Sequence, residues 1–512
     1  MTLVSEKSQV HKFHKEKLKD MSNHLLSKTS FLKSVQCSKA FFLYKNHYEL
    51  KDPLPKEKQA VFSRGQRVGI LAQSLFPGGI DVSPTHVSKF NDSVKKTKEL
   101  IEQGQKVIYE AAFVHDGVLI ALDILVYEGG KWYAYEVKSS LKISAAYVMD
   151  AALQYYVLSN CLPHLEDFYL VTMNDKYILR DTLDVQALFK IKSVKADAEK
   201  NVEFIKYHVQ LAKSIIDKDV LPKVEIGEKC FSPYQCDFYG TCWKHMPTNN
   251  IFEFSGISKK QAQVWYEKGF KTVYYIPEEE LSGNTKLMVQ AYKNHIEIID
   301  RLALQQFFSK VKYPLAFFDA EMYAPAVPQY KGTSPFEAMP FLFSWHRLDN
   351  DNAKLEHEYF FQEENSYAGK HLLDKLIEHA TKVNSILVFD TAQELKALSA
   401  VVKHLPEYKK QIDALKNKFI DFSDVFTHLW YYHPKTKGSM SLKKIYESVF
   451  DKNIFDELPI KSGLLASYKY DDYLKETDLF NKQELKINLV EYCKTDTQAM
   501  YDLFVYIKVA ML

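Results

Sequence analysis

The sequence predicts an α/β protein with two domains, and three observations lead to this prediction. The chain has 512 residues, more than one ordinary hydrophobic core accommodates. Two runs rich in β-branched and aromatic residues flank the pair Gly129-Gly130, and another buried-strand pattern begins near Tyr313. Segments with helical periodicity separate these strands, so each region is expected to carry helices of its own.

The composition limits the class of protein but not its partner. Hydrophobic residues make up 46% and charged residues 26%, which is ordinary for a globular chain. The net charge of +2 neither favours nor excludes nucleic acid, because a basic cleft is hidden by such an average. Neither a signal peptide nor a run of about 18 apolar residues is evident. A cytoplasmic location without membrane attachment is therefore expected, and protein partners are not predicted.

The first domain is expected over residues 31–250, after a polar tail at 1–30. From Leu26 to His47 the apolar residues share one helical face, which predicts one helix after a Ser/Thr cap. A further helix is expected over Arg64–Leu75, before the Pro-Gly-Gly stretch that ends it. The next segment, from Lys106, reads as a strand that leads into the central hairpin.

The central hairpin has a register that follows from its turn. A two-residue loop at Gly129-Gly130 pairs Glu128 with Lys131. Counting outward places Asp123 directly opposite Glu136, and opposed residues project from the same face of a sheet. Two like charges at this distance weaken a ladder unless something compensates them.

A divalent cation with oxygen ligands would compensate the opposed carboxylates. Lys138 points to the same face as Glu136, and Glu110 on the preceding strand is a possible additional carboxylate. The alternative is a solvated hairpin face without a function. A helix over Tyr147–Leu158 follows and carries Gln154; a strand from Asp167 and a long helix over Asp197–Ile216 complete the sequence of elements.

Asp123 followed by Glu136-Val137-Lys138 resembles the D…ExK core of PD-(D/E)XK nucleases, in the RecB-like group that includes iron-sulfur nucleases of CRISPR adaptation. The resemblance implies a restriction-endonuclease-like mixed sheet with flanking helices. It also implies that Asp123 and Glu136 hold Mg²⁺ or Mn²⁺, that Lys138 orients the attacking water, and that Gln154 is the family's helix glutamine. Two positions depart from the pattern: Gly69 replaces the frequent histidine, and a leucine follows Gln154 where tyrosine is usual.

Six cysteines in a chain of this kind point to metal before disulfides. Three are regularly spaced, and one early cysteine precedes them; four thiolates can hold a [4Fe–4S] cluster. The same layout of one early and three late cysteines is found in the iron-sulfur RecB-like nucleases. The four expected ligands are Cys37, Cys230, Cys236 and Cys242.

Two alternatives to the cluster remain. The C-x₂-H spacing of Cys242 and His245 fits a zinc knuckle, and the thiols are otherwise plain. Cys161 and Cys493 lie in expected helices among apolar neighbours and are expected to be small core residues.

The second domain is expected over 311–512, after a helical connector at 251–310. Its first strand carries Asp319 and Glu321, whose i, i+2 spacing puts both carboxylates on one face of an apolar run. Buried acids without partners are costly, so a metal ion is the natural companion.

Three further polar residues of the second domain have defined helical positions. Asp390 occupies an N-cap position with Gln393 at N3, a capping-box arrangement, and Glu394 projects from the first turn. Tyr492 and Asp496 lie four residues apart on one helical face.

These pieces resemble the DnaQ-like DEDD exonucleases of the YxxxD subgroup and imply an RNase H-like α/β domain. By position, Asp319 and Glu321 fill the first motif, Glu394 the second (with Asp390 as the other choice) and Asp496 the last. Tyr492 would position the water, between two Mg²⁺ ions about 4 Å apart. The second motif usually has aspartate, so Glu394 lengthens the reach of that ligand.

The pair of domains also resembles a group of bacterial proteins that join these two nuclease regions. We therefore expect a metal-dependent nuclease that acts on DNA, single-stranded or with free ends, and that has a second, 3′–5′ exonuclease-like site. The alternative is a nucleic-acid-binding scaffold in which one or both sites have decayed, which Gly69 and Glu394 favour.

Overall fold

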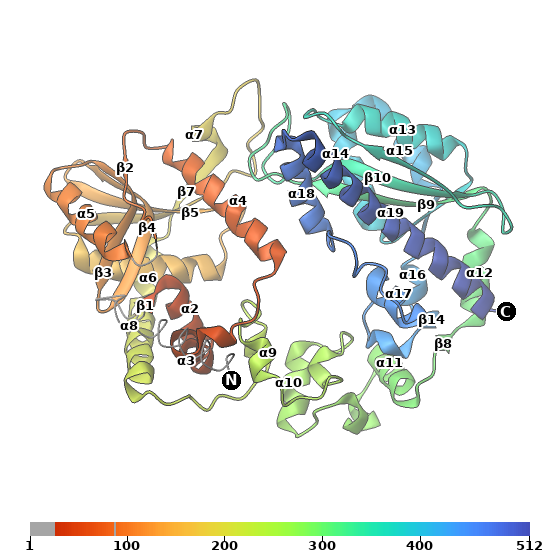
Figure 1. Cartoon of the computed structure of the whole chain (residues 1–512), viewed down its shortest axis with the longest axis horizontal. Coiled ribbons are helices and arrows are strands. Elements are labelled where there is room, and N and C mark those ends of the chain that lie inside the picture. The colour runs from red at the N-terminus through yellow and green to blue at the C-terminus, as the bar shows by residue number, and fades with distance from the viewer. Residues whose placement is uncertain (1–25, 87–88) are drawn as a thin grey trace, which may run out of the picture. The chain divides into compact units, whose positions relative to one another are not determined.

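The computed structural model describes residues 26–86 and 89–512, so most of the expected polar tail lies outside the described residues. The chain divides into two compact units, each containing helices and a mixed sheet (Figure 1). The first unit comprises Met1–Pro55, Val61–Tyr177 and Asp181–Lys244. The second comprises Lys56–Ala60, Ile178–Arg180 and His245–Leu512. The α/β class predicted from the sequence is confirmed.

A seven-stranded mixed sheet forms the framework of the first unit. The strands lie in the order β2-β3-β4-β5-β6-β7, and β1 pairs with β4. β3, β4 and β5 form an antiparallel meander, whereas β6 runs parallel to β5. The strands are β1 (Leu26–Ser27), β2 (Ile80–Asp81), β3 (Val107–His115), β4 (Val118–Glu128), β5 (Lys131–Lys138), β6 (Leu165–Met173) and β7 (Phe189–Ser193).

The predicted hairpin is confirmed in its turn and in its register. Gly129 and Gly130 both have positive φ, 56° and 81°, which is the conformation that a two-residue loop between twisted strands needs. Glu128 pairs with Lys131, and the ladder continues to Ile124 opposite Tyr135.

Five of the helices before Lys244 contribute to one apolar cluster with this sheet. The segment expected as one helix is instead two helices, because the backbone at Cys37 is extended (φ −164°, ψ 118°). The helix expected from Arg64 begins earlier, at Lys56. The helices are α2 (Lys28–Gln36), α3 (Ser38–Asn46), α4 (Lys56–Gln73), α5 (Phe90–Glu102), α6 (Ala145–Cys161), α7 (Val185–Leu188), α8 (Lys195–Lys218) and α9 (Tyr239–Cys242). Those that contribute to the apolar cluster are α2, α3, α5, α6 and α8.

A five-stranded mixed sheet organises the second unit, in the order β11-β10-β9-β12-β13. β9, β10 and β11 are antiparallel neighbours, and β12 and β13 extend the sheet in parallel with β9. The strands are β9 (Leu315–Tyr323), β10 (Met339–Leu348), β11 (Glu356–Phe361), β12 (Ser385–Val388) and β13 (Phe419–Asp421).

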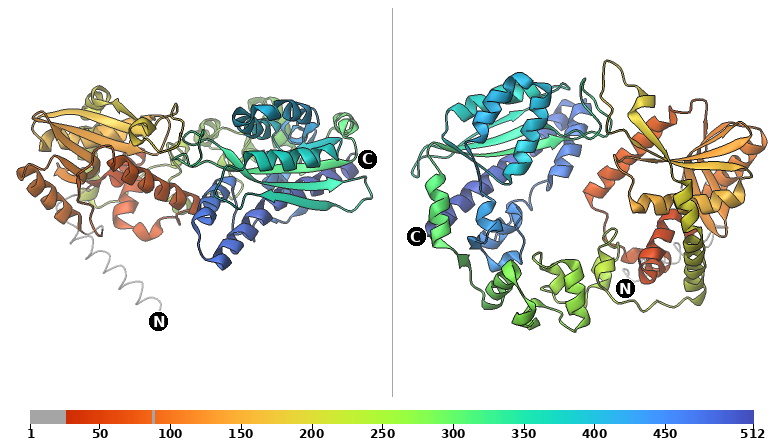
Figure 2. Two further views of the ribbon diagram at one scale, coloured as in Figure 1. Left: turned by 90° about the horizontal axis from the view of Figure 1, so that it is seen from above. Right: turned by 180° about the vertical axis from the view of Figure 1, so that it is seen from behind.

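Helices cover both faces of this sheet (Figure 2). Residues of α13 (Gly369–Thr381), α14 (Thr391–His404) and α15 (Lys409–Lys416) pack against Ala316 and Phe318 of β9. The opposite face, with Leu315, Phe317 and Tyr323, packs against the helices after residue 441. These are α17 (Leu442–Phe450), α18 (Gly463–Lys475) and α19 (Leu479–Ala510).

The region expected as a connector, 251–310, belongs to the second unit. Its last helix places Leu304 and Phe307 in the core beside α19, and β8 (Ile298–Ile299) pairs with β14 (Tyr431–Tyr432). The helices of this region are α10 (Lys259–Glu267), α11 (Gly283–Asn294) and α12 (Arg301–Lys310), and the short helix α16 (Asp424–Thr427) precedes β14. Within the described ranges, no helix combines the length and apolar composition that crossing a membrane requires.

Candidate functional site

Three carboxyl groups lie in a row across the meander of the first unit. The β3–β4 register, Tyr109 opposite Ile124 and Ala111 opposite Leu122, sets Glu110 beside Asp123. The β4–β5 register continues from Ile124 to set Asp123 beside Glu136, as the sequence predicts. The Oδ2 atom of Asp123 accepts a hydrogen bond of 2.5 Å from the backbone N–H of Val137. We call this row, with the side chains that contact it, the first centre.

Two ammonium groups hold one end of the row. Nζ of Lys138 donates to Glu136 Oε1 at 2.7 Å and to Asp150 Oδ2 at 2.5 Å. Nζ of Lys28 lies 2.7 Å and 3.1 Å from the same two oxygens. Glu136 and Asp150 are only 2% and 4% exposed, and with the two ammonium groups they form a charge-balanced ring.

This ring separates the pKa values of the three carboxyls in the row. Burial alone would raise the pKa of Glu136, but Lys138 and Lys28 outweigh it and hold that pKa below its usual range. Burial, and then the charges of Glu136 and Glu110, raise the pKa of Asp123 well above its usual value. Burial together with Glu136 and Asp81 raises the pKa of Glu110 to about 7.

Buried polar atoms around the row fit an additional ligand. Gln154 is fully buried, and neither its amide oxygen nor its amide nitrogen has a hydrogen-bond partner among the described residues. The same holds for Glu136 Oε2 and Asp150 Oδ1. Buried polar groups left unpaired cost about 1–3 kcal/mol each. A divalent cation and its water shell would satisfy these oxygens.

The four cysteines expected to act together line one small cavity. Phe238 and the start of α3 close it, and Lys39 is at its edge. Burial, with the other three thiols contributing, raises the pKa of Cys236 to about 12. His245, the imidazole of the zinc-knuckle alternative, is not among the described residues that line the cavity. The lining cysteines are Cys37, Cys230, Cys236 and Cys242.

The spacing of these thiols bears on which group fits. Among the described residues, the one trio of metal-binding side chains with donor atoms within 4.8 Å of one another lies elsewhere in the chain. No three of the four sulfurs are therefore that close. Zn–S bonds of about 2.3 Å bring tetrahedral sulfurs to within about 4 Å of one another. A single zinc ion would require these sulfurs to lie closer together.

The second centre is built from β9, α14 and α19. The alternation along β9 directs Asp319 and Glu321 to the same face as Phe317, toward α19. Glu394 in the first turn of α14 is 3% exposed, and its Oε2 has no hydrogen-bond partner among the described residues. Asp496 of α19 is 8% exposed. The structure thus brings all four acids predicted from the sequence together.

Mutual repulsion and burial define the electrostatics of the second centre. Burial raises the pKa of Asp319 to about 6, although Cys493 and Lys443 oppose the change. The pKa values of the other three acids lie well above their usual range, first through burial and then through Asp319 and its neighbours. Three buried carboxyls and the half-buried Asp319, with Lys443 as the cation that acts on three of the four, fit a site for divalent cations. The three acids other than Asp319 are Glu321, Glu394 and Asp496.

Tyr492 is held beside these acids by Lys443 of α17. Nζ of Lys443 donates to the Tyr492 hydroxyl at 2.9 Å and lies 4.4 Å from the ring centroid. Burial and the charge of Asp496 raise the pKa of Tyr492, so the phenol stays protonated.

Asp390 caps α14 as expected, accepting from Gln393 N–H at 3.2 Å. Its own N–H donates to Asp421 instead of the Gln393 side chain, so the capping box is only half formed.

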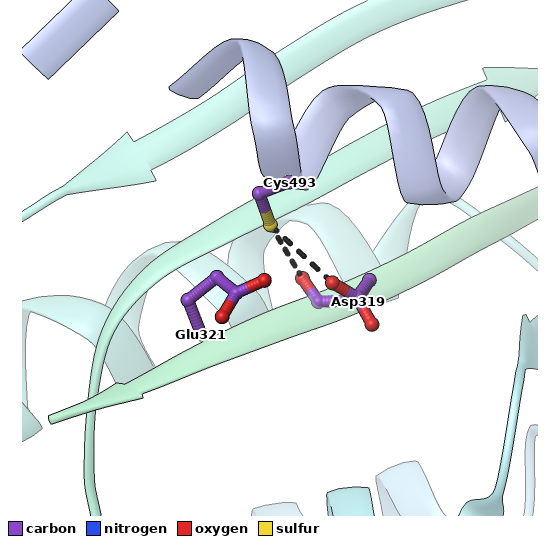
Figure 3. A group of neighbouring side chains, drawn as sticks. All are labelled: Asp319, Glu321 and Cys493. Atoms are coloured by element: carbon purple, nitrogen blue, oxygen red, sulfur yellow. Dashed lines mark hydrogen bonds between the residues drawn. The ribbon is translucent and has the colours of Figure 1, made fainter. Parts of the chain in front are cut away.

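Cys493 is a buried core residue, as the sequence predicts, and it also contacts an acid of the second centre. Its Sγ lies 3.5 Å from Asp319 Oδ2 and 3.6 Å from the Asp319 carbonyl oxygen (Figure 3).

Lys28 and Asp150 of the first centre were not predicted from the sequence. Asp150 lies one helical turn before Gln154, a spacing that sequence reasoning could have used, whereas Lys28 has no local signal because its contacts are long-range.

Comparison with known proteins yields one family match. A model described as a domain of unknown function (DUF2779) matches residues 316–441. This range includes β9 with both of its acids and Glu394, and it ends before Lys443 and α19. No curated protein matches the chain.

Proposed function

We propose that the protein is a metal-dependent nuclease that hydrolyses phosphodiester bonds of DNA, single-stranded or with free ends. The single observation that carries the proposal is the set of four acids of the second centre, which come from three elements and act on one another electrostatically; Glu321, Glu394 and Asp496 are buried and Asp319 is half-buried. Carboxylates gathered without matching cations are the usual ligands of catalytic Mg²⁺ or Mn²⁺. The sheet order and the position of the acids on β9 support an RNase H-like domain with 3′–5′ exonuclease activity.

In the second centre, Asp319, Glu321, Glu394 and Asp496 would hold the metal ions. The bound ions would supply Lewis-acid stabilisation of the attacking and leaving oxygens. The protonated Tyr492 hydroxyl accepts from Lys443, so its own hydrogen is free to orient a water molecule. Lys443 adds positive charge where a phosphate would lie.

In the first centre, Asp123 and Glu136 would hold one ion, with Glu110 and Asp150 close to it. Lys138 is placed to steady negative charge on phosphate. The element order α5-β3-β4-β5-α6-β6, with the acids on the second and third strands, supports a restriction-endonuclease-like, RecB-related unit. We further propose that the cavity lined by the four cysteines holds a [4Fe–4S] cluster, so that the protein purified without oxygen is brown.

A second candidate function is a nucleic-acid-binding scaffold in which one or both centres are inactive. Lys28 favours it, because its ammonium group occupies the same Glu136 oxygen that a cation would use. Gly69, near which no other atom would meet an added Cβ within 4 Å, supplies no ligand in place of the family's histidine.

The test is cleavage of end-labelled single- and double-stranded DNA and RNA with Mg²⁺, Mn²⁺ or EDTA. We expect metal-dependent shortening of DNA with free 3′ ends, abolished by EDTA and by Glu321→Gln. Failure to cleave any substrate under all metal conditions would favour the scaffold.

A further inference from the structure

A thiol lies among the acids of the second centre. Within the described parts of the chain, Asp319, Glu321 and Cys493 form the one trio of metal-binding side chains whose donor atoms all lie within 4.8 Å of one another (Figure 3). Cys493 projects from α19 toward β9, and its Sγ is 3.5 Å from Asp319 Oδ2. The thiol is fully buried, so bulk water does not compete for it.

A second observation indicates that this trio faces a ligand position. Glu394 comes from a different element, is almost fully buried, and has an Oε2 atom without a hydrogen-bond partner among the described residues. Asp319 and Glu321 are the neighbouring charges that act most strongly on its carboxyl group. Glu394 therefore has an unpaired buried oxygen and interacts electrostatically with both acids of the trio.

We propose that Cys493 is a metal ligand and that one of the ions of the second centre is a thiophilic divalent cation of the zinc class. The inference rests on the proposed function only in that it places a metal ion at these acids. Mg²⁺ and Mn²⁺ favour oxygen ligands, whereas zinc binds thiolate and carboxylate together. When the Sγ–metal bond forms, the thiol proton leaves to solvent, and Asp319 and Glu321 complete the ligand set.

The test compares metal binding by the full-length wild-type protein and by Cys493→Ser, with Cd²⁺ as the zinc-class probe and Mn²⁺ as the oxygen-preferring probe. Calorimetric titration should show Cd²⁺ affinity of the second centre reduced at least about tenfold in Cys493→Ser. Mn²⁺ affinity should change by less than about threefold. Cys161→Ser, which removes a thiol of the first unit, is the matched control and should change neither affinity.

A second measurement covers the case in which Cys493→Ser folds poorly. Cd²⁺ bound by a thiolate gives an ultraviolet charge-transfer band. Glu321→Gln keeps the thiol but removes an oxygen ligand of the same ion, so its band should be weaker than that of the wild type at a Cd²⁺ concentration that half-fills the wild-type site. An unchanged band and unchanged Cd²⁺ affinity in these variants would overturn the inference. Failure of the proposed function appears differently, as Mn²⁺ binding and DNA cleavage that persist in Glu321→Gln.

Discussion

At the scale of single residues, Lys28 of the first centre contacts the oxygens that the proposed metal ion would use. Nζ of Lys28 lies 2.7 Å from Glu136 Oε1 and 3.1 Å from Asp150 Oδ2. A cation that uses either oxygen must displace this contact or share it. Lys138 contacts the same oxygens, but it is the lysine that the ExK spacing places there. Lys28 therefore acts as the competitor.

Replacing Lys28 with methionine, which keeps the aliphatic length, should raise the affinity of the first centre for Mn²⁺ by roughly tenfold, because a competing positive charge is removed. Calorimetric titration measures the change. Lys190→Met, which breaks an exposed pair with Asp175, is the control and should leave the affinity unaltered. Weaker Mn²⁺ binding in Lys28→Met would instead mean that Lys28 positions the acids.

The raised pKa of Glu110 makes the stability of the metal-free protein depend on pH. Burial, Glu136 and Asp81 raise that pKa from 4.5 to about 7, so the folded protein keeps a proton that the unfolded chain releases. The contribution of this group to stability is therefore fully present below about pH 4.5 and is lost as the pH rises through about 7. Glu110→Gln should raise the free energy of unfolding at pH 8 by about 1–3 kcal/mol.

Urea denaturation with a chelator present measures this effect at pH 5 and pH 8. Glu99→Gln, on an exposed face of α5, is the matched control and should follow the wild-type pH dependence. If Glu110→Gln and the wild type lose stability equally between the two pH values, the proton is not bound at Glu110.

At the scale of elements, α2 joins the first centre to the cysteine cavity. Its first residue is Lys28, and Cys37 is its C-cap. Between these two residues, Lys33 Nζ contacts Asp237 Oδ2 at 2.5 Å. Gln36 Nε2 donates to three carbonyl oxygens of the cysteine loop, at 2.8 to 3.1 Å. One nine-residue helix thus contacts both the cysteine loop and the carboxylate row.

Gln36→Ala removes these hydrogen bonds and should loosen both ends of α2. We expect amide hydrogen exchange over 228–242 and over α2 to accelerate by about fivefold to tenfold, since the bonds together contribute about 1 kcal/mol. Gln210→Ala, which breaks one exposed contact of α8 with Asp116, is the control. Exchange that rises in the loop but not in α2 would show that the helix does not couple the two sites.

The sequence predicts an element well where neighbouring residues determine it, and poorly where residues distant in the chain determine it. The hairpin and its register were predicted because Gly129-Gly130 defines the turn locally. The break at Cys37 was not predicted, because no proline or glycine marks it. Phe31 of α2 and Phe41 of α3 are buried in the core on either side of the break. The contacts of Lys28 and Cys493 likewise depend on residues more than 100 positions away, which no local pattern encodes.

At the scale of the whole molecule, each centre draws its residues from one compact unit. The residues of the first centre fall before Lys244, and the acids of the second lie after His245. Sites that share no partners respond nearly additively to substitution. The two proposed activities should therefore be separable by single changes.

Glu136→Ala should remove the cleavage activity of the first centre and leave the stepwise shortening from 3′ ends. Asp319→Ala should remove the stepwise shortening and leave the activity of the first centre. Each change deletes an oxygen ligand from a different centre. Asp319→Ala should also remain folded, because losing one of four crowded acids relieves repulsion in the metal-free state. Labelled DNA resolved by length measures both activities, with Glu99→Gln as the unaffected control. If either single change abolishes all cleavage, the two centres do not act independently, and one unit is then the only catalyst or both contribute to one reaction.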